Sequence, residues 1–183
     1  MQEKTRCKWC NLKNPLYIKY HDEEWCQPNF DEHYLFEMLI LESFQAGLSW
    51  ECVLNKREDF RKAFDNFDID KISKYNDKKI EELLKNEKII RNKLKINAAI
   101  NNSKIFKSIQ KECGSFYNYL KTFTKEITVY EIDEVTSELS DAISKDLIKR
   151  GMKFVGSTII YSYLQAIGVI YSHDKECFMY QEK

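Results

Sequence analysis

Residues that interrupt helices are scarce in this chain of 183 residues, which contains only 5 glycines and 2 prolines. Both prolines, Pro15 and Pro28, lie near the N-terminus. Because glycine and proline most often end helices and form turns, their distribution predicts an irregular segment over residues 1–30 followed by helices. We expect one all-α domain spanning residues 1–183, with a second irregular segment over residues 171–183.

Two segments are apolar almost all round at helical spacing, which is typical of buried helices. One follows Asp31, a suitable N-cap, and the other opens at Gly156 and Ser157. Less apolar helices are expected between them. We expect these from Ser49 to Phe64, after Asn76, over residues 91–112 with an end at Gly114, over residues 115–125, and from Ser137 or Ser140 to Gly151.

The charges balance, with 29 basic and 29 acidic residues and a formal net charge of zero. Binding to nucleic acid would therefore require basic residues to cluster on one face, and residues 85–95 and 145–153 are the two basic stretches. No apolar run reaches the roughly 18–20 residues that cross a bilayer. The first residues also lack the apolar segment of a signal peptide. We therefore expect a cytoplasmic protein with no membrane contact.

Cysteine and histidine occur at both ends of the chain. Cys7 and His21 lie near the N-terminus, and His173 and Cys177 lie near the C-terminus. Two cysteines and two histidines suit a closed tetrahedral zinc site, which would join the two ends and contribute folding free energy. The spacing matches no zinc finger, and Cys10 could replace His21 as a ligand. These residues alone therefore leave open a zinc site or simple burial of small apolar side chains.

Aromatic residues crowd the segment PLYIKYHDEEW, which contains Tyr17, Tyr20 and Trp25, and Trp9 lies just upstream. Such a group forms either a lid over the helical core or a cage that stacks a planar or cationic ligand. The residues alone do not decide between these two interpretations.

Glu42 lies on an apolar stripe of the helix that follows Asp31. The other members of this stripe are Leu35, Met38, Leu39 and Ala46. An unpaired carboxylate would be costly on such a face. Glu42 is therefore either a buried acid paired with an arginine or lysine, or an acid that faces a ligand, and the periodicity leaves both open.

Four segments in this order resemble successive motifs of the bacterial 3-methyladenine DNA glycosylase I family. They are PLYIKYHDEEW, LFEMLILESFQAGLSW, IIRNKLKI and KRGMKFVGSTIIYSYLQA. The resemblance spans roughly residues 6–177. It implies an all-helical fold of the helix-hairpin-helix glycosylase superfamily, with a structural zinc ion that joins the N- and C-terminal segments.

The resemblance also implies roles for individual residues. It selects Cys7, His21, His173 and Cys177 as zinc ligands, which excludes Cys10. It assigns Glu42 as the catalytic residue. The base-binding residues would be Tyr17, Tyr20 and Trp50, with Trp9 packing nearby. Within the motif at residues 45–49, Leu48 would enter the base stack of the DNA.

DNA contacts are implied at two connections between helices. Residues 86–90 would form a hairpin at which Lys88 and Arg91 add positive charge, and Gly156 and Ser157 would make a second contact at a helix start. The sequence departs from the family pattern at Lys88 and at Cys26, where glycine is usual.

The implied activity is hydrolysis of the N-glycosidic bond of 3-methyladenine in double-stranded DNA, which leaves an abasic site. We expect a monomer that forms no lysine Schiff base and does not cleave the strand. One alternative is a zinc-stabilised helical module that binds nucleic acid or protein without catalysis. A zinc-dependent hydrolase is a weaker alternative, since four protein ligands leave no open position on the metal.

Overall fold

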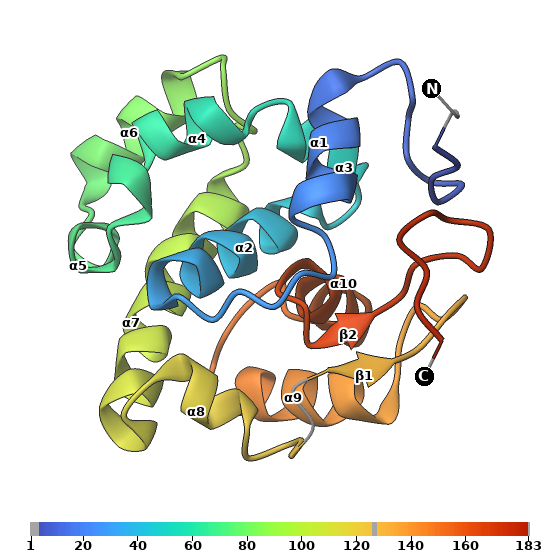
Figure 1. Ribbon diagram of the computed structural model, residues 1–183. Coiled ribbons are helices and arrows are strands. Elements are labelled where there is room, and N and C mark those ends of the chain that lie inside the picture. Colours follow the sequence, from blue (N-terminus) through green and yellow to red (C-terminus); the bar gives the residue numbers. More distant parts are fainter. Residues whose placement is uncertain (1–3, 126–127, 183) are drawn as a thin grey trace.

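The computed structural model describes residues 4–125 and 128–182, and they fold into a mostly helical structure (Figure 1). In chain order, the elements are α1 (Pro15–Glu23), α2 (Glu32–Gln45), α3 (Trp50–Leu54), α4 (Arg57–Ala63), the short 3-10 helix η1 (Asp65–Phe67), α5 (Ile69–Ile72), α6 (Asp77–Lys85), α7 (Lys93–Cys113), α8 (Phe116–Leu120), β1 (Val129–Tyr130), α9 (Glu138–Lys149), α10 (Ser157–Ala166) and β2 (Ile170–Tyr171).

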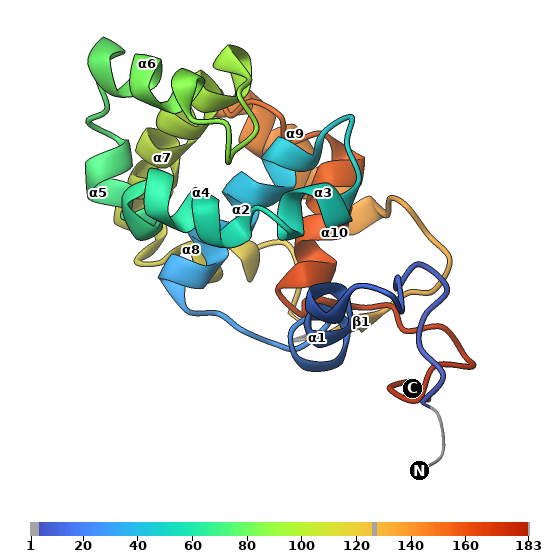
Figure 2. The same ribbon diagram turned by 90° about the horizontal axis from the view of Figure 1, so that it is seen from above.

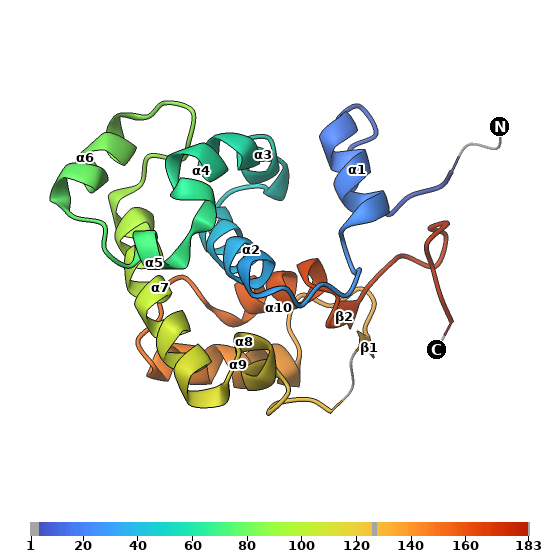
Figure 3. The same ribbon diagram turned by 60° about the vertical axis from the view of Figure 1, so that its left-hand side comes forward.

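The two most apolar helices, α2 and α10, form the centre of the fold. They pack against each other, and α10 also packs against α9 while α2 packs against α7. Figures 1 and 3 show α4, α5 and α6 on one side of α2, and α8 and α9 on the other. In α2, every residue from Leu35 to Phe44 is buried. Burial on all sides explains why this helix has no polar face.

Several expected helix starts and ends are confirmed. Asp31, Asn76 and Ser137 are N-caps whose side chains accept hydrogen bonds from backbone N–H groups of the first turn. Gly114 ends α7 with a φ of 83°, a left-handed conformation that glycine adopts without strain. Local capping chemistry therefore sets these boundaries.

Other expectations were wrong. Residues 1–30 are not wholly irregular, because Asn14 caps α1 and Pro15 occupies its first turn. The helix expected from Ser49 to Phe64 is broken into α3 and α4 at residues 55–56. The helix expected over residues 115–125 ends at Leu120. Of the segment expected to be irregular over residues 171–183, Tyr171 lies in β2, which corrects that bound, while the described residues 172–182 contain no helix or strand, as expected.

A small parallel pairing of β1 with β2 departs from a purely helical fold. The apolar helix that begins at Ser157 ends at Ala166, and Gly168 then turns the chain toward β2 with a φ of 75°. A Cβ atom at Gly168 would lie 2.3 Å from the backbone nitrogen of Pro28. Only glycine therefore allows residues 26–29 to run alongside the end of α10, where the Cys26 N–H donates to the Gln165 carbonyl at 2.9 Å.

The two ends of the described chain meet at one side of the molecule (Figure 2). The Phe178 N–H donates to the Thr5 carbonyl at 2.8 Å, and the Lys8 N–H donates to the Asp174 carboxylate at 2.8 Å. No helix in the described residues is both long enough and apolar enough to cross a membrane.

Candidate active site

A cavity of about 290 Å³ opens between α1, α2, α3 and α10. This volume is close to the lower end of the range for small-molecule sites. The residues that line it are Trp9, Tyr17, Tyr20, Trp25, Glu42, Gln45, Trp50, Asp133, Glu134, Ser162, Gln165, Ser172 and Asp174. The five residues that the resemblance assigned to the base pocket therefore share one cavity.

Aromatic rings form one wall of this cavity. The ring centroids of Tyr20 and Trp50 lie 5.3 Å apart, and those of Trp9 and Tyr17 lie 5.2 Å apart. Trp9 also packs edge-on against Trp25 with centroids 4.6 Å apart. These rings come from three separate parts of the chain and still present their surfaces to the same space. They can therefore hold a flat ligand.

Glu42 is the acidic group of this cavity. It is only 2% exposed, and burial raises the pKa of its carboxyl group well above the usual range. Across the described residues, no salt bridge or hydrogen bond joins it to an arginine or lysine, and its Oε2 atom has no hydrogen-bond partner. The structure therefore excludes, for the residues it describes, a structural acid paired with a buried cation. The carboxyl group remains available to a ligand.

Within the described parts of the chain, three further buried polar atoms of the cavity residues have no hydrogen-bond partner. They are the indole Nε1 atoms of Trp9 and Trp50 and the amide Oε1 of Gln45. Buried polar groups are almost always hydrogen-bonded in folded proteins. Two donors, an amide oxygen and a carboxyl group without partners around one cavity therefore indicate a polar, planar ligand that completes their hydrogen bonds.

Both tyrosine hydroxyls of the cavity are neutral at physiological pH, and burial raises their pKa values further. Burial is the largest cause that raises the pKa of Tyr17 to about 12, and nearby acids add to the effect. Burial also raises the pKa of Tyr20 well above its usual range, with a further contribution from Glu42. Both hydroxyls can therefore donate hydrogen bonds.

The turn between α2 and α3 brings an apolar side chain to the surface beside these residues. Gly47 has a φ of 76°, and the Leu48 N–H donates to the Gln45 carbonyl at 2.6 Å. Leu48 is 43% exposed. Ser49 then caps α3, the helix that begins with Trp50. The exposed leucine is thus held between two cavity residues, Gln45 and Trp50.

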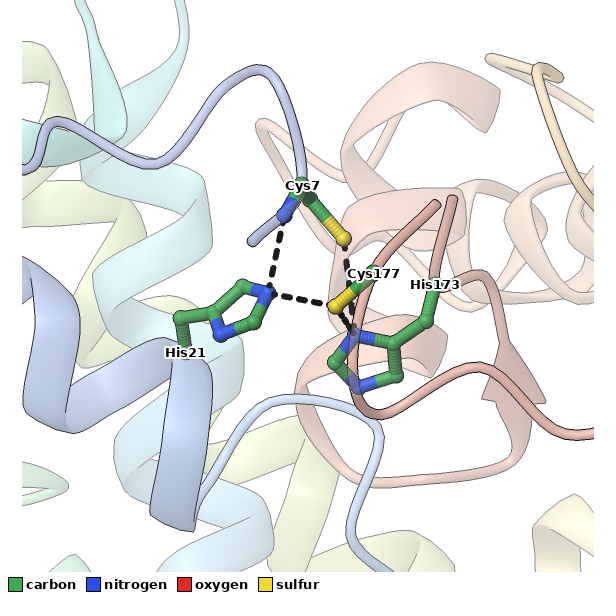
Figure 4. Close-up of side chains that lie close together, drawn as sticks. All are labelled: Cys7, His21, His173 and Cys177. Carbon is green, nitrogen blue, oxygen red and sulfur yellow. Dashed lines mark hydrogen bonds between the residues drawn. The ribbon is translucent and has the colours of Figure 1, made fainter. Parts of the chain in front are cut away.

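The second candidate site lies where the chain ends meet. The ligand atoms of Cys7, His21, His173 and Cys177 all lie within 4.8 Å of one another, and all four residues are buried (Figure 4). His173 Nδ1 lies 3.4 Å from Cys7 Sγ and 3.5 Å from Cys177 Sγ, and His21 Nε2 lies 3.5 Å from Cys177 Sγ. A tetrahedral zinc ion with ordinary bond lengths separates nitrogen and sulfur ligands by about 3.6 Å. The donor set and its spacing fit zinc.

Neighbouring groups hold the two histidines in a form that binds metal. Asp22 accepts a hydrogen bond from His21 Nδ1 at 2.8 Å, which leaves Nε2 to face the other ligands, and Arg6 forms an ion pair with the same carboxylate. Burial lowers the pKa of His173 to about 4, so its ring is neutral. Cys10, the alternative ligand, lies outside the cluster, and its thiol contacts the Tyr17 carbonyl at 3.8 Å.

The cluster of Cys7, His21, His173 and Cys177 shares a wall with the cavity. The Trp9 ring lies 5.4 Å from the His21 ring, and the Trp25 ring lies 4.7 Å from the His173 ring, measured between centroids. Both tryptophans also line the cavity. A metal ion in the cluster would therefore hold in place the side of the cavity that the chain ends form.

The five residues expected to contact DNA do not line the cavity: Leu48 lies in the turn beside it, and the other four lie at two further helix connections. Lys88 lies in the connection between α6 and α7, and Arg91 lies just before α7. Gly156 and Ser157 lie where α10 begins. The sequence reasoning missed the polar lining from α10, Ser162 and Gln165. These two side chains interrupt an otherwise apolar helix, which is the signal that could have indicated a cavity beside it.

Known proteins resemble this chain in both sequence and fold. The sequence model of the methyladenine glycosylase family matches residues 9–180. The DNA-3-methyladenine glycosylase 1 of Escherichia coli (strain K12) is 43% identical over 96% of both chains. A crystal structure of 3-methyladenine DNA glycosylase I superimposes with a TM-score of 0.92 at 40% identity, covering 97% of this chain and 100% of the other. A structure of a variant of such an enzyme in complex with 3-methyladenine has a TM-score of 0.88 at 30% identity, covering 94% and 96%.

Proposed function

The chain belongs to the methyladenine glycosylase family, and we propose that it excises 3-methyladenine from alkylated double-stranded DNA, acting as a monomer. It hydrolyses the N-glycosidic bond and leaves an abasic site. The observation that carries this proposal is a buried acid, Glu42, which has no cationic partner in the described residues and faces a cavity walled by aromatic rings.

The chemistry of the lesion matches this cavity. An enzyme that acts on a base within a duplex must first flip the base out of the stack, and a damaged base costs less to extrude. 3-Methyladenine is cationic while it is attached to its sugar. Tyr20 and Trp50 therefore attract it through cation–π contact, and unmodified adenine gains less. A positive charge beside Glu42 also favours the ionised carboxylate over the protonated form that burial favours.

Catalysis then requires little beyond binding and charge stabilisation, because the cationic base is already a good leaving group. Glu42 accepts a hydrogen bond from the exocyclic amine and stabilises the positive charge on the base. Water completes the hydrolysis at the sugar. The reaction uses no lysine nucleophile, so no covalent adduct with DNA forms.

The direct test is chromatography of the bases that the protein releases from methylated duplex DNA. We expect 3-methyladenine to be freed and the strands to remain intact. Incubation of the protein with abasic DNA and borohydride should trap no adduct. A protein that binds abasic-site DNA but frees no base would instead be the non-catalytic binding module, and the proposal would be abandoned.

Zinc is the metal proposed for the cluster of Cys7, His21, His173 and Cys177. The support is the four buried ligands at tetrahedral spacing and the carboxylate of Asp22 that orients His21. When bound, the ion would cross-link the N- and C-terminal segments through its bonds to the four side chains. Its four protein ligands leave no position for water or substrate, so the reaction does not pass through it.

DNA phosphate is proposed to bind at the connection between α9 and α10. The N-cap of α10, Gly156, offers no side chain to the N–H groups of the first turn, and a Cβ there would meet nothing within 4 Å. The first turn of α10 therefore has no side-chain cap, and its N–H groups can bind an anion. Within the same connection, the Lys153 N–H donates to Asn102 Oδ1 at 2.9 Å, and Asn102 Nδ2 donates to the Lys153 carbonyl at 2.8 Å. These two hydrogen bonds keep the connection in one conformation.

The connection between α6 and α7 is a weaker phosphate site. Asn92 already caps α7 by accepting from the Lys95 N–H at 3.1 Å, and the Asn86 side chain accepts from the Lys88 N–H at 3.0 Å. Few backbone donors therefore remain for a ligand there. Lys88 and Arg91 are proposed to contribute charge to phosphate binding rather than a built site, and Leu48 is proposed to fill the space that the flipped base leaves.

Substitution of the exposed Lys153 by alanine should therefore weaken binding to duplex DNA several-fold and reduce the slope of log affinity against log salt by about 1. Arg91→Ala should have a smaller effect. Fluorescence anisotropy over a range of salt concentrations measures both variants. A larger loss with Arg91→Ala would move the main phosphate contact to the other connection.

A further inference from the structure

The turn between α2 and α3, residues 46–49, connects the main functional groups. Glu42 and Gln45 precede it on α2, Leu48 lies within it, and Trp50 follows it on α3. A shift of this turn would displace the exposed Leu48, while Trp50 stays packed against Tyr20 with ring centroids 5.3 Å apart. A group that fixes the turn therefore controls the position of the leucine without touching the substrate.

Lys95 of α7 reaches this turn from the other side of the fold. Its ammonium Nζ donates to the Phe44 carbonyl at 2.8 Å and to the Ala46 carbonyl at 2.6 Å. These carbonyls belong to the C-terminal end of α2, where backbone groups lack helical partners and the helix dipole is negative. Lys95 thus completes the end of α2 at the point where the turn begins.

The cost of this arrangement indicates a specific role. Lys95 is only 6% exposed, and within the described part of the chain its ammonium forms no salt bridge with a carboxylate. Burial lowers its pKa. Burying a charge without an opposite charge is unfavourable unless hydrogen bonds compensate for it. An uncharged cap such as glycine would end the helix without this cost.

Lys95 also lies beside the connection that is proposed to bind phosphate. Its Nζ is 5.9 Å from the centroid of the Phe154 ring, and Phe154 has a φ of 56°, a strained conformation for an aromatic residue. On the same helix, Asn101 donates to the Gly151 carbonyl at 2.8 Å, and Asn102 holds Lys153. Helix α7 therefore contacts both the turn at residues 46–49 and the start of the α9–α10 connection.

We propose that Lys95 is a positioning residue, which fixes the turn at residues 46–49 relative to the α9–α10 connection so that Leu48 enters the duplex where the backbone is held. This inference rests on the proposed glycosylase function. The rate on duplex DNA depends on Lys95 through Leu48, because a misplaced turn leaves the flipped base without its replacement in the stack.

Substitution of Lys95 by methionine removes the ammonium and keeps the apolar stem. We expect Lys95→Met to lower the single-turnover rate of 3-methyladenine release from duplex DNA by roughly 10- to 100-fold, while affinity for the free base changes less than about 3-fold. Lys95→Arg keeps the charge and the donors and should recover most of the rate. Lys104→Met, on an exposed position of the same helix, is the matched control and should behave as the wild type.

A double-substitution cycle distinguishes positioning from general stability. If Lys95 acts through the turn, the Lys95→Met/Leu48→Ala protein should be no slower than Leu48→Ala alone. If the fold-reduction in rate of the double variant equalled the product of the two single fold-reductions, the proposal would be overturned. A Lys95→Met protein that is unfolded at the assay temperature would also overturn it, because the lysine would then maintain the fold rather than the turn.

Amide hydrogen exchange separates this inference from the proposed function. The Leu48 amide should exchange faster in Lys95→Met than in Lys104→Met, whatever reaction the protein catalyses. Wild-type protein that releases no 3-methyladenine would refute the function alone. Equal exchange in the two variants would refute the role of Lys95 alone.

Discussion

Glutamine in place of Glu42 is expected to lower the rate of 3-methyladenine release on the order of 100-fold, the scale at which one preorganised electrostatic contact acts. The substitution keeps the shape of the side chain but removes the negative charge that the cationic base induces and then contacts. Single-turnover release from methylated duplex DNA measures the effect. Glu81→Gln, at an exposed position on α6, is the matched control and should leave the rate unchanged.

The same variant should be at least as stable as the wild type. Burial raises the pKa of Glu42 in the folded protein, so the folded state binds this proton more tightly than the unfolded state. The free energy of unfolding therefore falls as the pH rises above the ordinary pKa of 4.5 toward the raised value. Glu42→Gln lacks this loss. Its advantage over the wild type should grow with pH in that window, as chemical denaturation at several pH values would show.

A variant that is slow but equally or more stable is the expected signature of a functional acid. If Glu42→Gln released 3-methyladenine at the wild-type rate, the carboxylate would have no part in the reaction. If the variant were instead much less stable, Glu42 would have a structural partner. Either result would remove it from the site.

Serine in place of Cys177 is expected to abolish stoichiometric zinc binding and to lower the thermal midpoint by about 6–12 °C. Zinc bound to four protein ligands contributes about 10–16 kcal/mol in small domains, so the loss of one ligand should cost at least about 3 kcal/mol, which corresponds to that shift in a chain of this size. Metal analysis and thermal unfolding measure the two effects.

The control for this variant is Cys113→Ser, at the end of α7 and outside the cluster, which should keep its zinc. Base release should also fall in Cys177→Ser, because Trp9 and Trp25 contact both the cluster histidines and the cavity. Purified wild-type protein without zinc and with an unchanged thermal midpoint after chelation would refute a structural metal.

The elements that local chemistry determines could be predicted from the sequence. Asp31, Asn76 and Ser137 cap their helices because their side chains satisfy the first N–H groups. Glu42 stood out because helical spacing put a carboxylate on the apolar stripe. The periodicity could not decide whether a cation would meet it, since that depends on which distant helices pack against α2.

The features that were missed depend on local signals given too little weight or on distant contacts. Asn14 and Pro15 are a sound helix start, but the aromatic residues that follow them show no clear periodicity, so α1 was expected to be irregular. No glycine or proline marks the break at residues 55–56. The pairing of Val129 with Ile170 joins residues far apart in the chain, which no local pattern reveals.

In the candidate sites too, the sequence indicates the residue types, whereas contacts between distant segments decide which of them come together. The sequence held both cysteines and both histidines, but their spacing allowed Cys10 in place of His21. The choice of His21 came from the family resemblance. In the structure His21 belongs to the cluster, whereas Cys10 lies outside it. The cavity itself is a product of packing between α1, α2, α3 and α10. The sequence could indicate its aromatic residues but not their common orientation.

The most direct test of the account is a titration of the protein with free 3-methyladenine, followed through the indole N–H signals of its tryptophans by NMR. Trp9 and Trp50 line the cavity, and no described residue accepts a hydrogen bond from their Nε1 groups. Both signals should therefore shift and saturate with 3-methyladenine, weakly or not at all with adenine, and less in Glu42→Gln. Unchanged indole signals with 3-methyladenine, or equal shifts with both bases, would contradict the claim that aromatic rings facing Glu42 capture the lesioned base.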